Sequence, residues 1–355
     1  MRPVIHVITT IEMGGAEKQL LILATAQVKS GRKVRVCYLK GNPELANEFK
    51  AGGIEMLDHL ANKNFLIQIY LLRKMLSRSN ELIHAHLPQA ELLAAFAGFR
   101  HKLIVTRHNS EPFWPKKPRI VSNSLSRFVS FRARTVIAIS DAVKEYLIQR
   151  GEIRKRAKVV VVYYGFSSEI LKRPSRESGL IFGTISRLTE QKDLPTMLGA
   201  FAKFSASRAS SKLYIVGEGH LRANLEKLTY DLEIKDKVLW LGRTSDIDTF
   251  LDSLDVFLLT SLYEGFGMVL LEAISRSVPI IASNNDAVSE VLGEDSPSLF
   301  SIGDVGGLAE KMKQIQDPDF KENLLTSNLM RIEKFSIPKM LSSLDSIYSN
   351  TVESV

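Results

Sequence analysis

The chain alternates between two hydrophobic patterns. Short apolar runs rich in β-branched residues are followed by longer stretches in which apolar residues recur at helical spacing. This alternation is typical of β-α-β units, whose strands form parallel sheets, and it predicts a doubly wound α/β fold. The predicted strands of the first half are Val4–Thr9, Lys33–Tyr38, Leu82–His86, Leu103–Arg107, Thr135–Ile139 and Val159–Tyr163, with clear helices at Ala16–Ser30 and Asp141–Gln149; those of the second half are Leu180–Ser186, Lys212–Val216, Val238–Leu241, Val256–Thr260 and Pro279–Ala282.

A polar, proline-interrupted stretch, Ser167–Gly179, separates the two sets of strands and is the expected interdomain linker. A chain of 355 residues also exceeds the size at which a single core keeps growing, so two domains are expected. We place them at residues 1–168 and 169–334. Two similar α/β halves in series suggest a cleft between them, lined by the carboxyl edge of each sheet.

The composition is that of a soluble globular enzyme, with 45% hydrophobic and 24% charged residues and a mean hydropathy of +0.00. The longest uncharged apolar stretches, such as Leu92–Phe99, are far shorter than the ~18 residues of a spanning helix, so we predict no transmembrane helix. The first residues are expected to form a strand and not a signal peptide. Cys37 is the single cysteine, which excludes an internal disulfide and a cysteine-based metal cluster, fits a reducing cytoplasm, and suggests a buried apolar role.

Charge is distributed unevenly along the chain. Residues 1–168 hold 27 Lys and Arg against 12 Asp and Glu, and the remainder holds 20 against 27, which gives +15 and −7 and sums to the net +8. A basic first half points to an anionic partner, and nucleic acid and membrane both qualify. The segments 113–120 and 126–134 mix aromatic residues with cations, as interfacial segments on anionic lipid do. A solvated helix face with a few core aromatics explains this mixture equally well.

Two acids eight residues apart, Glu264 and Glu272, follow the predicted strand that ends near Ser261. On a helical path they would lie roughly 80° apart and about 12 Å along the axis. That span suits a ligand with hydroxyl groups at two ends and a charged middle. Open α/β sheets bind ligands at this carboxyl end of their strands.

Three glycine or cation motifs follow other strands. Gly14 and Gly15 open the first helix and are a phosphate-loop candidate, but they lack the full Gly-x-Gly-x-x-Gly and Walker patterns, and a tight turn without a ligand is the alternative. Arg187 and Lys192 occupy the corresponding place in the second half, where they would clamp a diphosphate or be solvated surface residues. Gly217, in Val216-Gly-Glu-Gly219, brings backbone close to a nucleotide or forms a plain turn.

Taken in order, these motifs cover most of the chain and resemble glycosyltransferase family four, of the bacterial surface-polysaccharide type. The resemblance implies a GT-B fold, which is two Rossmann-like doubly wound domains facing across a cleft. It also implies a nucleotide-sugar donor held mainly by the C-terminal domain and transfer with retention at the anomeric carbon. The helical pattern of Phe335–Ser349 resembles the family's closing helix, so residues 335–355 are assigned to the N-terminal, acceptor-side domain.

Residue roles follow from the same resemblance. Glu264 is expected to touch donor-sugar hydroxyls, Glu272 the ribose hydroxyls, and Arg187 with Lys192 to neutralise the diphosphate. His108, just past a predicted strand, resembles the family's active-site histidine, although a lone histidine is more often structural. The remaining donor-binding candidates are the backbone groups of Gly14, Gly15, Gly217, Gly265, Phe266 and Gly267; a buried aromatic turn is the alternative reading of the last three.

No cofactor and no metal are expected. Asp246-Ile-Asp248 has the Asp-x-Asp pattern of metal sites, but its place before a helix favours capping. His84 and His86 alternate on one strand and face the same side; His86 could line the cleft, but a metal pair is not expected without further ligands.

The chain departs from the family at two places. Tyr164-Gly165 stands where many relatives have Asn-Gly, and the glycine-rich turn before the late glutamate is altered, so neither Tyr164 nor Glu290 is assigned a ligand contact.

The expected function is that of a retaining hexosyltransferase. It moves a hexose or N-acetylhexosamine from a nucleotide-diphosphate sugar, UDP-sugar favoured and GDP-sugar possible, to a lipid-linked saccharide in lipopolysaccharide, O-antigen or capsule assembly. The expected location is cytoplasmic and peripheral, on the inner face of the cytoplasmic membrane, with an anionic membrane surface and not nucleic acid as partner. A nucleotide-sugar epimerase of related fold and a non-catalytic nucleotide-sugar binder are the alternatives.

Overall fold

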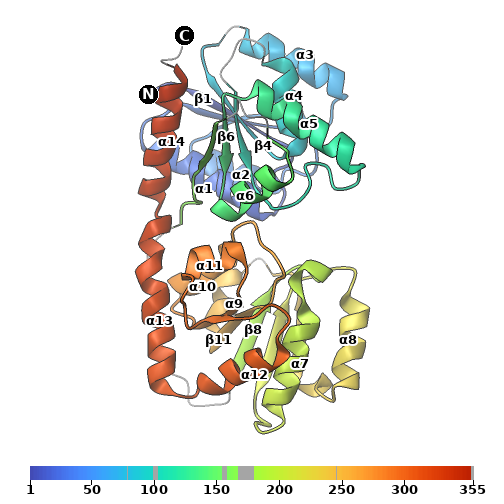
Figure 1. Ribbon diagram of the computed structural model, residues 1–355. Coiled ribbons are helices and arrows are strands. Elements are labelled where there is room, and N and C mark those ends of the chain that lie inside the picture. Colours follow the sequence, from blue (N-terminus) through green and yellow to red (C-terminus); the bar gives the residue numbers. More distant parts are fainter. Residues whose placement is uncertain (78, 99–102, 154–157, 167–179, 245, 353–355) are drawn as a thin grey trace. The chain divides into compact units, whose positions relative to one another are not determined.

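The structure is a computed structural model that describes residues 1–77, 79–98, 103–153, 158–166, 180–244 and 246–352. It divides into two compact units, each a parallel sheet flanked by helices (Figure 1). Unit 1 comprises Met1–Phe166 and Phe335–Val355, and unit 2 comprises Ser167–Lys334. The expected linker Ser167–Gly179 lies outside the described residues.

Unit 1 contains a seven-stranded sheet in the order β3-β2-β1-β4-β5-β6-β7, with every neighbouring pair parallel. Its central strands are buried because helices cover both faces, which explains their nearly continuous apolar sequences. The elements are β1 (Val4–Ile8), α1 (Gly15–Lys29), β2 (Val34–Tyr38), α2 (Ala46–Ala51), β3 (Glu55–Leu57), α3 (Phe65–Leu76), β4 (Leu82–His86), α4 (Pro88–Ala97), β5 (Leu103–Arg107), α5 (Arg119–Arg132), β6 (Thr135–Ala138), α6 (Asp141–Gln149), β7 (Lys158–Val161) and α14 (Ile337–Val352).

Unit 2 contains a six-stranded parallel sheet in the order β10-β9-β8-β11-β12-β13. This is the doubly wound order in which the chain reverses direction beside its first strand, here between β8 and β11. The elements are β8 (Ile181–Ile185), η1 (Glu190–Lys192), α7 (Leu194–Ser205), β9 (Lys212–Val216), α8 (Arg222–Asp231), η2 (Lys235–Lys237), β10 (Val238–Gly242), α9 (Ile247–Asp252), β11 (Val256–Leu259), α10 (Met268–Ser275), β12 (Ile280–Ser283), α11 (Asp286–Leu292), β13 (Leu299–Phe300), α12 (Val305–Gln314) and α13 (Pro318–Ile332), followed by η3 (Glu333–Phe335).

The predicted strands are confirmed, with ends that differ by at most two residues. Two strands were not predicted, β3 and β13. Both are edge strands of two or three residues, too short for a hydrophobic alternation to show in the sequence. Cys37 is fully buried on β2, as expected.

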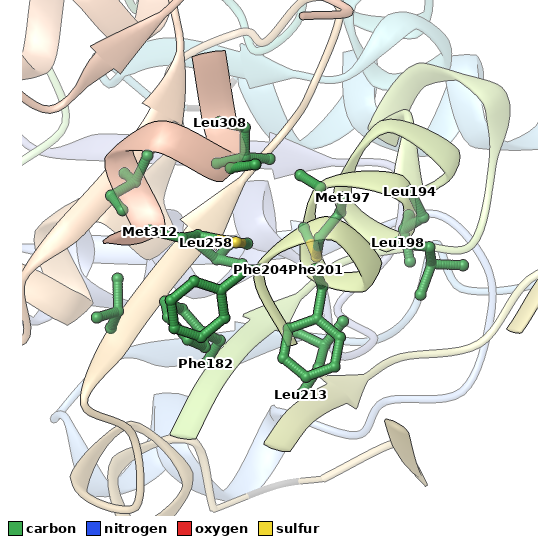
Figure 2. Close-up of a cluster of buried hydrophobic side chains, with 14 of the residues drawn as sticks. Phe182, Leu194, Met197, Leu198, Phe201, Phe204, Leu213, Leu258, Leu308 and Met312 are labelled. Carbon is green, nitrogen blue, oxygen red and sulfur yellow. The ribbon is translucent and has the colours of Figure 1, made fainter. Parts of the chain in front are cut away.

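The core of unit 2 forms between α7 and the sheet. Apolar residues recur along α7 at helical spacing, and Figure 2 shows them gathered over β8, β9 and β11. Phe182 packs edge-on against Phe201 and Phe204, with ring centroids 6.2 and 5.1 Å away. This packing fixes β8 against the last turns of α7. Arg187 and Lys192 both lie in the turn that connects these two elements.

The core of unit 1 is completed by α14, which returns from the far end of the chain. Tyr348, Leu344 and Met340 are buried against the residues of β1, β2 and α1. Arg32 pairs with Asp345 at 2.6 Å, and Phe166 donates its amide to the carbonyl of Phe335 at 2.7 Å. The last helix of the sequence is therefore an integral part of the first unit.

Unit 1 also buries an ionic triad. The guanidinium of Arg107 lies 2.9 Å from Glu91 and 3.6 Å from Glu152, and it stacks on the Phe113 ring at 4.4 Å. All three charged side chains are at most 6% exposed. One cation between two carboxylates leaves one negative charge uncompensated in a low-dielectric interior. Burial raises the pKa of Glu91 from its usual 4.5 to about 7, the nearby carboxylate of Glu152 adds to the rise, and Arg107 opposes it.

This raised pKa predicts a pH-dependent stability. Between pH 4.5 and 7 the folded chain keeps a proton on Glu91 that the unfolded chain has lost, so the free energy of unfolding should fall as pH rises through that window. In the wild type this fall in the free energy of unfolding should be on the order of 2–3 kcal/mol. Glu91→Gln should abolish it, because the glutamine amide does not titrate. Urea unfolding at pH 5 and pH 7.5 measures it, with exposed Glu48→Gln as the matched control. Equal pH dependence in the wild type and Glu91→Gln would contradict the assignment.

Candidate active site

Arg187 and Lys192 lie in the turn between β8 and α7 of unit 2. The exposed guanidinium of Arg187 donates to Gln191 Oε1 at 3.0 Å. Gln191 in turn donates its side-chain amide to the carbonyl of Tyr263 at 2.9 Å, and its own carbonyl accepts from the amide of Leu262 at 2.8 Å. The β8–α7 turn is thereby joined to the loop that follows β11.

Glu264 lies in that loop, directly beside Lys192. Lys192 Nζ is 2.5 Å from Glu264 Oε1, which also accepts from the Ser261 hydroxyl at 2.7 Å. The two ionic side chains are only 14% and 10% exposed. The structure thus brings together Arg187, Lys192 and Glu264, which the sequence had placed after two different strands.

The expected helical path from Glu264 to Glu272 is wrong. Helix α10 begins at Met268, and Gly267 before it has a left-handed backbone with φ 84°. An L side chain rarely adopts that conformation, so the glycine ends the loop and starts the helix in a new direction. Glu264 belongs to the loop, and Glu272 is a partly exposed residue of α10.

The Glu264 loop is held from beneath by residues that the sequence analysis did not select. The carbonyl of Ser261 accepts from Ser283 Oγ at 2.6 Å and from Asn285 Nδ2 at 2.9 Å. Asn285 also caps α11 by accepting from the Val288 amide at 3.2 Å. Thr260 Oγ1 donates to the Lys192 carbonyl at 2.7 Å. The available signal was the helix-capping pattern at Asn285; the contacts of Ser283 and Thr260 depend on tertiary placement.

Gly217 and Gly219 are explained by backbone packing. A Cβ on Gly217 would lie 1.8 Å from the Ser186 carbonyl oxygen, and one on Gly219 2.3 Å from the Leu188 carbonyl oxygen. Gly217 also has φ 135°. These glycines let the turn after β9 pair with the turn after β8, through Leu188 N to Glu218 O at 3.0 Å. They therefore position Arg187 whether or not their amides touch a ligand.

The remaining residues of unit 2 that the sequence singled out are Gly265, Phe266, Glu290 and Asp246. Phe266 is 2% exposed, so its ring is buried and the turn that contains it is the buried aromatic turn of the alternative interpretation. Gly265 beside it is partly exposed. The carbonyl of Glu290 accepts from Arg331 at 2.9 Å. Asp246 accepts from the Thr249 amide at 2.9 Å and caps α9, which confirms the capping interpretation.

The charges of this cluster suit an anion, with a carboxylate beside it that can accept hydrogen bonds from hydroxyl groups. Two cations lie at the carboxyl end of the sheet, and one of them is shielded from water by its carboxylate partner. A negative charge placed there interacts more strongly than in bulk solvent because the local dielectric is lower. Carboxylates and backbone groups in the same loop are the hydrogen-bond partners that sugar hydroxyls require.

Gly14 and Gly15 belong to unit 1, at the start of α1. Gly14 is the residue before the helix, and the carboxylate of Glu17 folds back over it while accepting from Thr10 Oγ1 at 2.7 Å. Burial raises the pKa of Glu17. Around Gly15 the space where a side chain would stand is open.

Unit 1 also places His108 at the end of a row of buried imidazoles with His6, His84 and His86. His6 lies on β1, and His84 and His86 lie on the neighbouring β4. His86 Nδ1 is 3.1 Å from His108 Nε2, and His108 Nδ1 is 2.5 Å from the Tyr164 hydroxyl. Tyr164, which stands where many family members have asparagine, is therefore a direct hydrogen-bond partner of His108.

Three of these imidazoles, His6, His84 and His86, are close enough to share a metal ion, with ligand atoms within 4.8 Å of one another. Both ring nitrogens of each, however, already lie at hydrogen-bond distance from protein groups. A metal would have to break these contacts at a buried site, so the geometry favours hydrogen bonding.

Family models match both halves of the chain: residues 13–169 match "Glycosyltransferase Family 4" and residues 167–325 match "Glycosyl transferases group 1". The chain is 27% identical over 350 residues to a Campylobacter jejuni enzyme, GalNAc-alpha-(1->4)-GalNAc-alpha-(1->3)-diNAcBac-PP-undecaprenol alpha-1,4-N-acetyl-D-galactosaminyltransferase, covering 95% of each chain. It is 28% identical over 288 residues to N-acetyl-alpha-D-glucosaminyl L-malate synthase of Bacillus anthracis, covering 76% of this chain and 74% of that one.

Solved structures show the same fold. That of Anabaena Alr3699/HepE in complex with UDP and glucose superposes with a TM-score of 0.84 and 20% identity, covering 99% of this chain and all of that one. With both halves matched, the protein belongs to glycosyltransferase family four and is a glycosyltransferase of the GT-B fold.

Proposed function

We propose that the protein is a retaining glycosyltransferase that moves a hexose or N-acetylhexosamine from a nucleotide-diphosphate sugar to a lipid-linked saccharide in surface-polysaccharide assembly. The observation that carries the donor half is the Lys192–Glu264 pair beside Arg187, at the carboxyl edge of the unit 2 sheet. UDP-sugars are the favoured donors, in keeping with the UDP bound by the Anabaena protein of the same fold.

The proposed step breaks the bond between the anomeric carbon and the diphosphate oxygen. The electron pair stays on the diphosphate, whose growing charge Arg187 and Lys192 stabilise more in the transition state than in the ground state. Glu264 accepts hydrogen bonds from the sugar and offsets its oxocarbenium-like charge, and Glu272 binds the ribose hydroxyls. An acceptor hydroxyl then bonds to the anomeric carbon from the face that the diphosphate leaves, and its proton passes to the diphosphate oxygen that has kept the electron pair. Because these side chains supply the positive charge, the proposal requires no metal and no cofactor.

His108 of unit 1 is proposed to hydrogen-bond a substrate hydroxyl near the reacting carbon. Burial lowers the pKa of His108 to about 3, with the charge of Arg107 adding to the effect, so the ring is neutral. A neutral imidazole offers one donor and one acceptor, so it can accept a hydrogen bond from a hydroxyl.

The lipid-linked acceptor is supported by the name of the Campylobacter relative, which ends in PP-undecaprenol, whereas the Bacillus relative is named for L-malate. Unit 1 has features that fit a membrane surface. Leu66 on α3 and Ile120 and Phe131 on α5 are exposed apolar side chains, and Lys116 and Lys117, just before α5, are exposed cations. Among the helices that the structure describes, none has the length and apolar character needed to cross a bilayer.

Removing the partly buried cation tests the donor site. We expect Lys192→Ala to lower kcat by about 10²–10³-fold, the usual cost of losing one preorganised group that stabilises developing charge. Glu264→Gln, which keeps the shape and loses the charge, should also lower kcat strongly. Exposed Lys203→Ala on α7 is the matched control, and thermal unfolding of each variant separates lost chemistry from lost folding. Wild-type turnover in Lys192→Ala would remove that residue from the proposed step.

Donor class is measured by ligand-dependent thermal unfolding. UDP-sugars at about 100 times their Kd should stabilise the protein by about 2.7 kcal/mol, and GDP-sugars at the same concentration by less. Incubation with the stabilising donor alone should give no epimer, and transfer with acceptor should persist in excess EDTA. An epimerised donor would favour the epimerase alternative, and binding without any turnover would favour the non-catalytic binder.

Membrane association is measured by sedimentation with vesicles. We expect binding to anionic vesicles at low salt that weakens as salt is raised, since exposed charges are screened. A variant with Ile120→Ser and Phe131→Ser should bind less, whereas Met330→Ser, an exposed apolar residue of unit 2, should bind normally. Equal binding to neutral and anionic vesicles would contradict the proposed surface.

A further inference from the structure

The buried imidazoles of unit 1 form a continuous hydrogen-bonded row. His6 Nε2 lies 2.8 Å from Gln27 Oε1, and His6 Nδ1 lies 3.0 Å from His86 Nε2. His86 Nδ1 lies 3.1 Å from His108 Nε2, and His108 Nδ1 lies 2.5 Å from the Tyr164 hydroxyl. The row therefore runs from α1, through β1 and β4, to the residue after β5.

Parallel register explains why the sequence produces this row. His6 pairs with His84 across β1 and β4, and His86 lies two residues further on, so all three rings project from the same face of the sheet. His86 pairs with Thr106 on β5, so His108 continues the line just after β5 ends. Ring centroids along it, from His6 to His86 and from His86 to His108, are 5.2 and 5.3 Å apart.

A neutral imidazole has one N–H and one lone pair, so each ring that donates on one side must accept on the other. Burial lowers the pKa of His6 to about 4 and that of His86 well below its usual value, which keeps the rings neutral. Gln27 Oε1 can only accept. His6 must then carry its proton on Nε2 and accept at Nδ1, and the same assignment passes to His86 and to His108.

A second branch continues from the Gln27 amide with the same donor direction. Gln27 Nε2 donates to the Tyr348 hydroxyl at 3.1 Å. That hydroxyl lies 2.8 Å from His84 Nδ1, and His84 Nε2 lies 2.6 Å from Thr106 Oγ1. If His84 carries its proton on Nε2, it donates to Thr106 and accepts from Tyr348. Every group from Tyr164 to His84 then donates to the next group along the line, which ends at Thr106.

We propose that Gln27, His6 and His86 are positioning residues that fix His108 as the neutral Nε2–H tautomer, so that its Nδ1 accepts from a hydroxyl. The Tyr164 hydroxyl takes that place here, and a sugar or acceptor hydroxyl is the class of group that Nδ1 is prepared to accept from. The catalytic part rests on the proposed role of His108 in transfer. The tautomer itself stands on the hydrogen-bond geometry of unit 1.

The direct test is ¹⁵N NMR of histidine-labelled full-length protein, in which long-range couplings report which ring nitrogen carries the proton. We expect His6, His86 and His108 all to be Nε2–H tautomers. An Nδ1–H tautomer at His108 would overturn the proposal. Added Zn²⁺ should leave the signals of His6, His84 and His86 unchanged, since each of their nitrogens is engaged; stoichiometric shifts would instead show a metal site.

Variants separate positioning from general disruption. Gln27→Met removes the acceptor that sets the direction, so His108 should populate both tautomers and kcat should fall on the order of tenfold with the donor KM unchanged. Thr106→Val is the matched control. It removes the hydrogen bond between His84 and residue 106, and it leaves the hydrogen bonds from Gln27 to His108 intact. In Thr106→Val both the His108 tautomer and kcat should match the wild type. An unchanged His108 tautomer in Gln27→Met would overturn the proposal.

A double variant tests whether Gln27 acts through His6. If it does, adding Gln27→Met to His6→Phe should lower kcat no further than His6→Phe alone, and additive losses would count against the row. A changed His108 tautomer with wild-type kcat would confirm the row and contradict the proposed role of His108 in transfer. The two proposals therefore fail by different measurements.

Discussion

The ion pair between Lys192 and Glu264 is the contact on which the proposed donor site depends. It joins the turn after β8 to the loop after β11, the two central neighbours of the unit 2 sheet, and it holds both charges in a largely dehydrated place. An unpaired charge there would be costly, so each residue stabilises the other in the geometry that we propose for diphosphate binding. Gln191, Ser261 and Asn285 reinforce the same junction with neutral hydrogen bonds.

Much of this arrangement was predictable because parallel strands end at a common edge. Once β8 and β11 were identified, Arg187, Lys192 and Glu264 had to lie near that edge. The sequence did not show in the same way that Glu264 lies in a loop and not on a helix. The apolar residues of α10 extend a helical pattern back toward it, and only the left-handed backbone of Gly267 shows that the helix begins at Met268. Short edge strands such as β3 were missed because pairing, and not their own sequence, defines them.

The histidine row shows a different limit of sequence reasoning. Alternation on β4 correctly places His84 and His86 on one face, but it says nothing of which nitrogen meets which partner. That depends on rotamers, on the register of β1 against β4, and on Gln27 and Tyr348, which lie 321 positions apart in the chain. The same is true of Tyr164. It stands where many family members have asparagine, and the structure shows that it is the hydrogen-bond partner of His108.

The contribution of α14 to unit 1 has a consequence for biosynthesis. Tyr348 and its neighbours pack against β1 and β2, which are made about 300 residues earlier, and the whole of unit 2 is translated in between. During translation the second unit has all of its chain available before the first does, so the usual N-terminal-first order of domain maturation is reversed. A chain whose synthesis stops before α14 would hold all of unit 2 but would lack the residues that complete the core of unit 1.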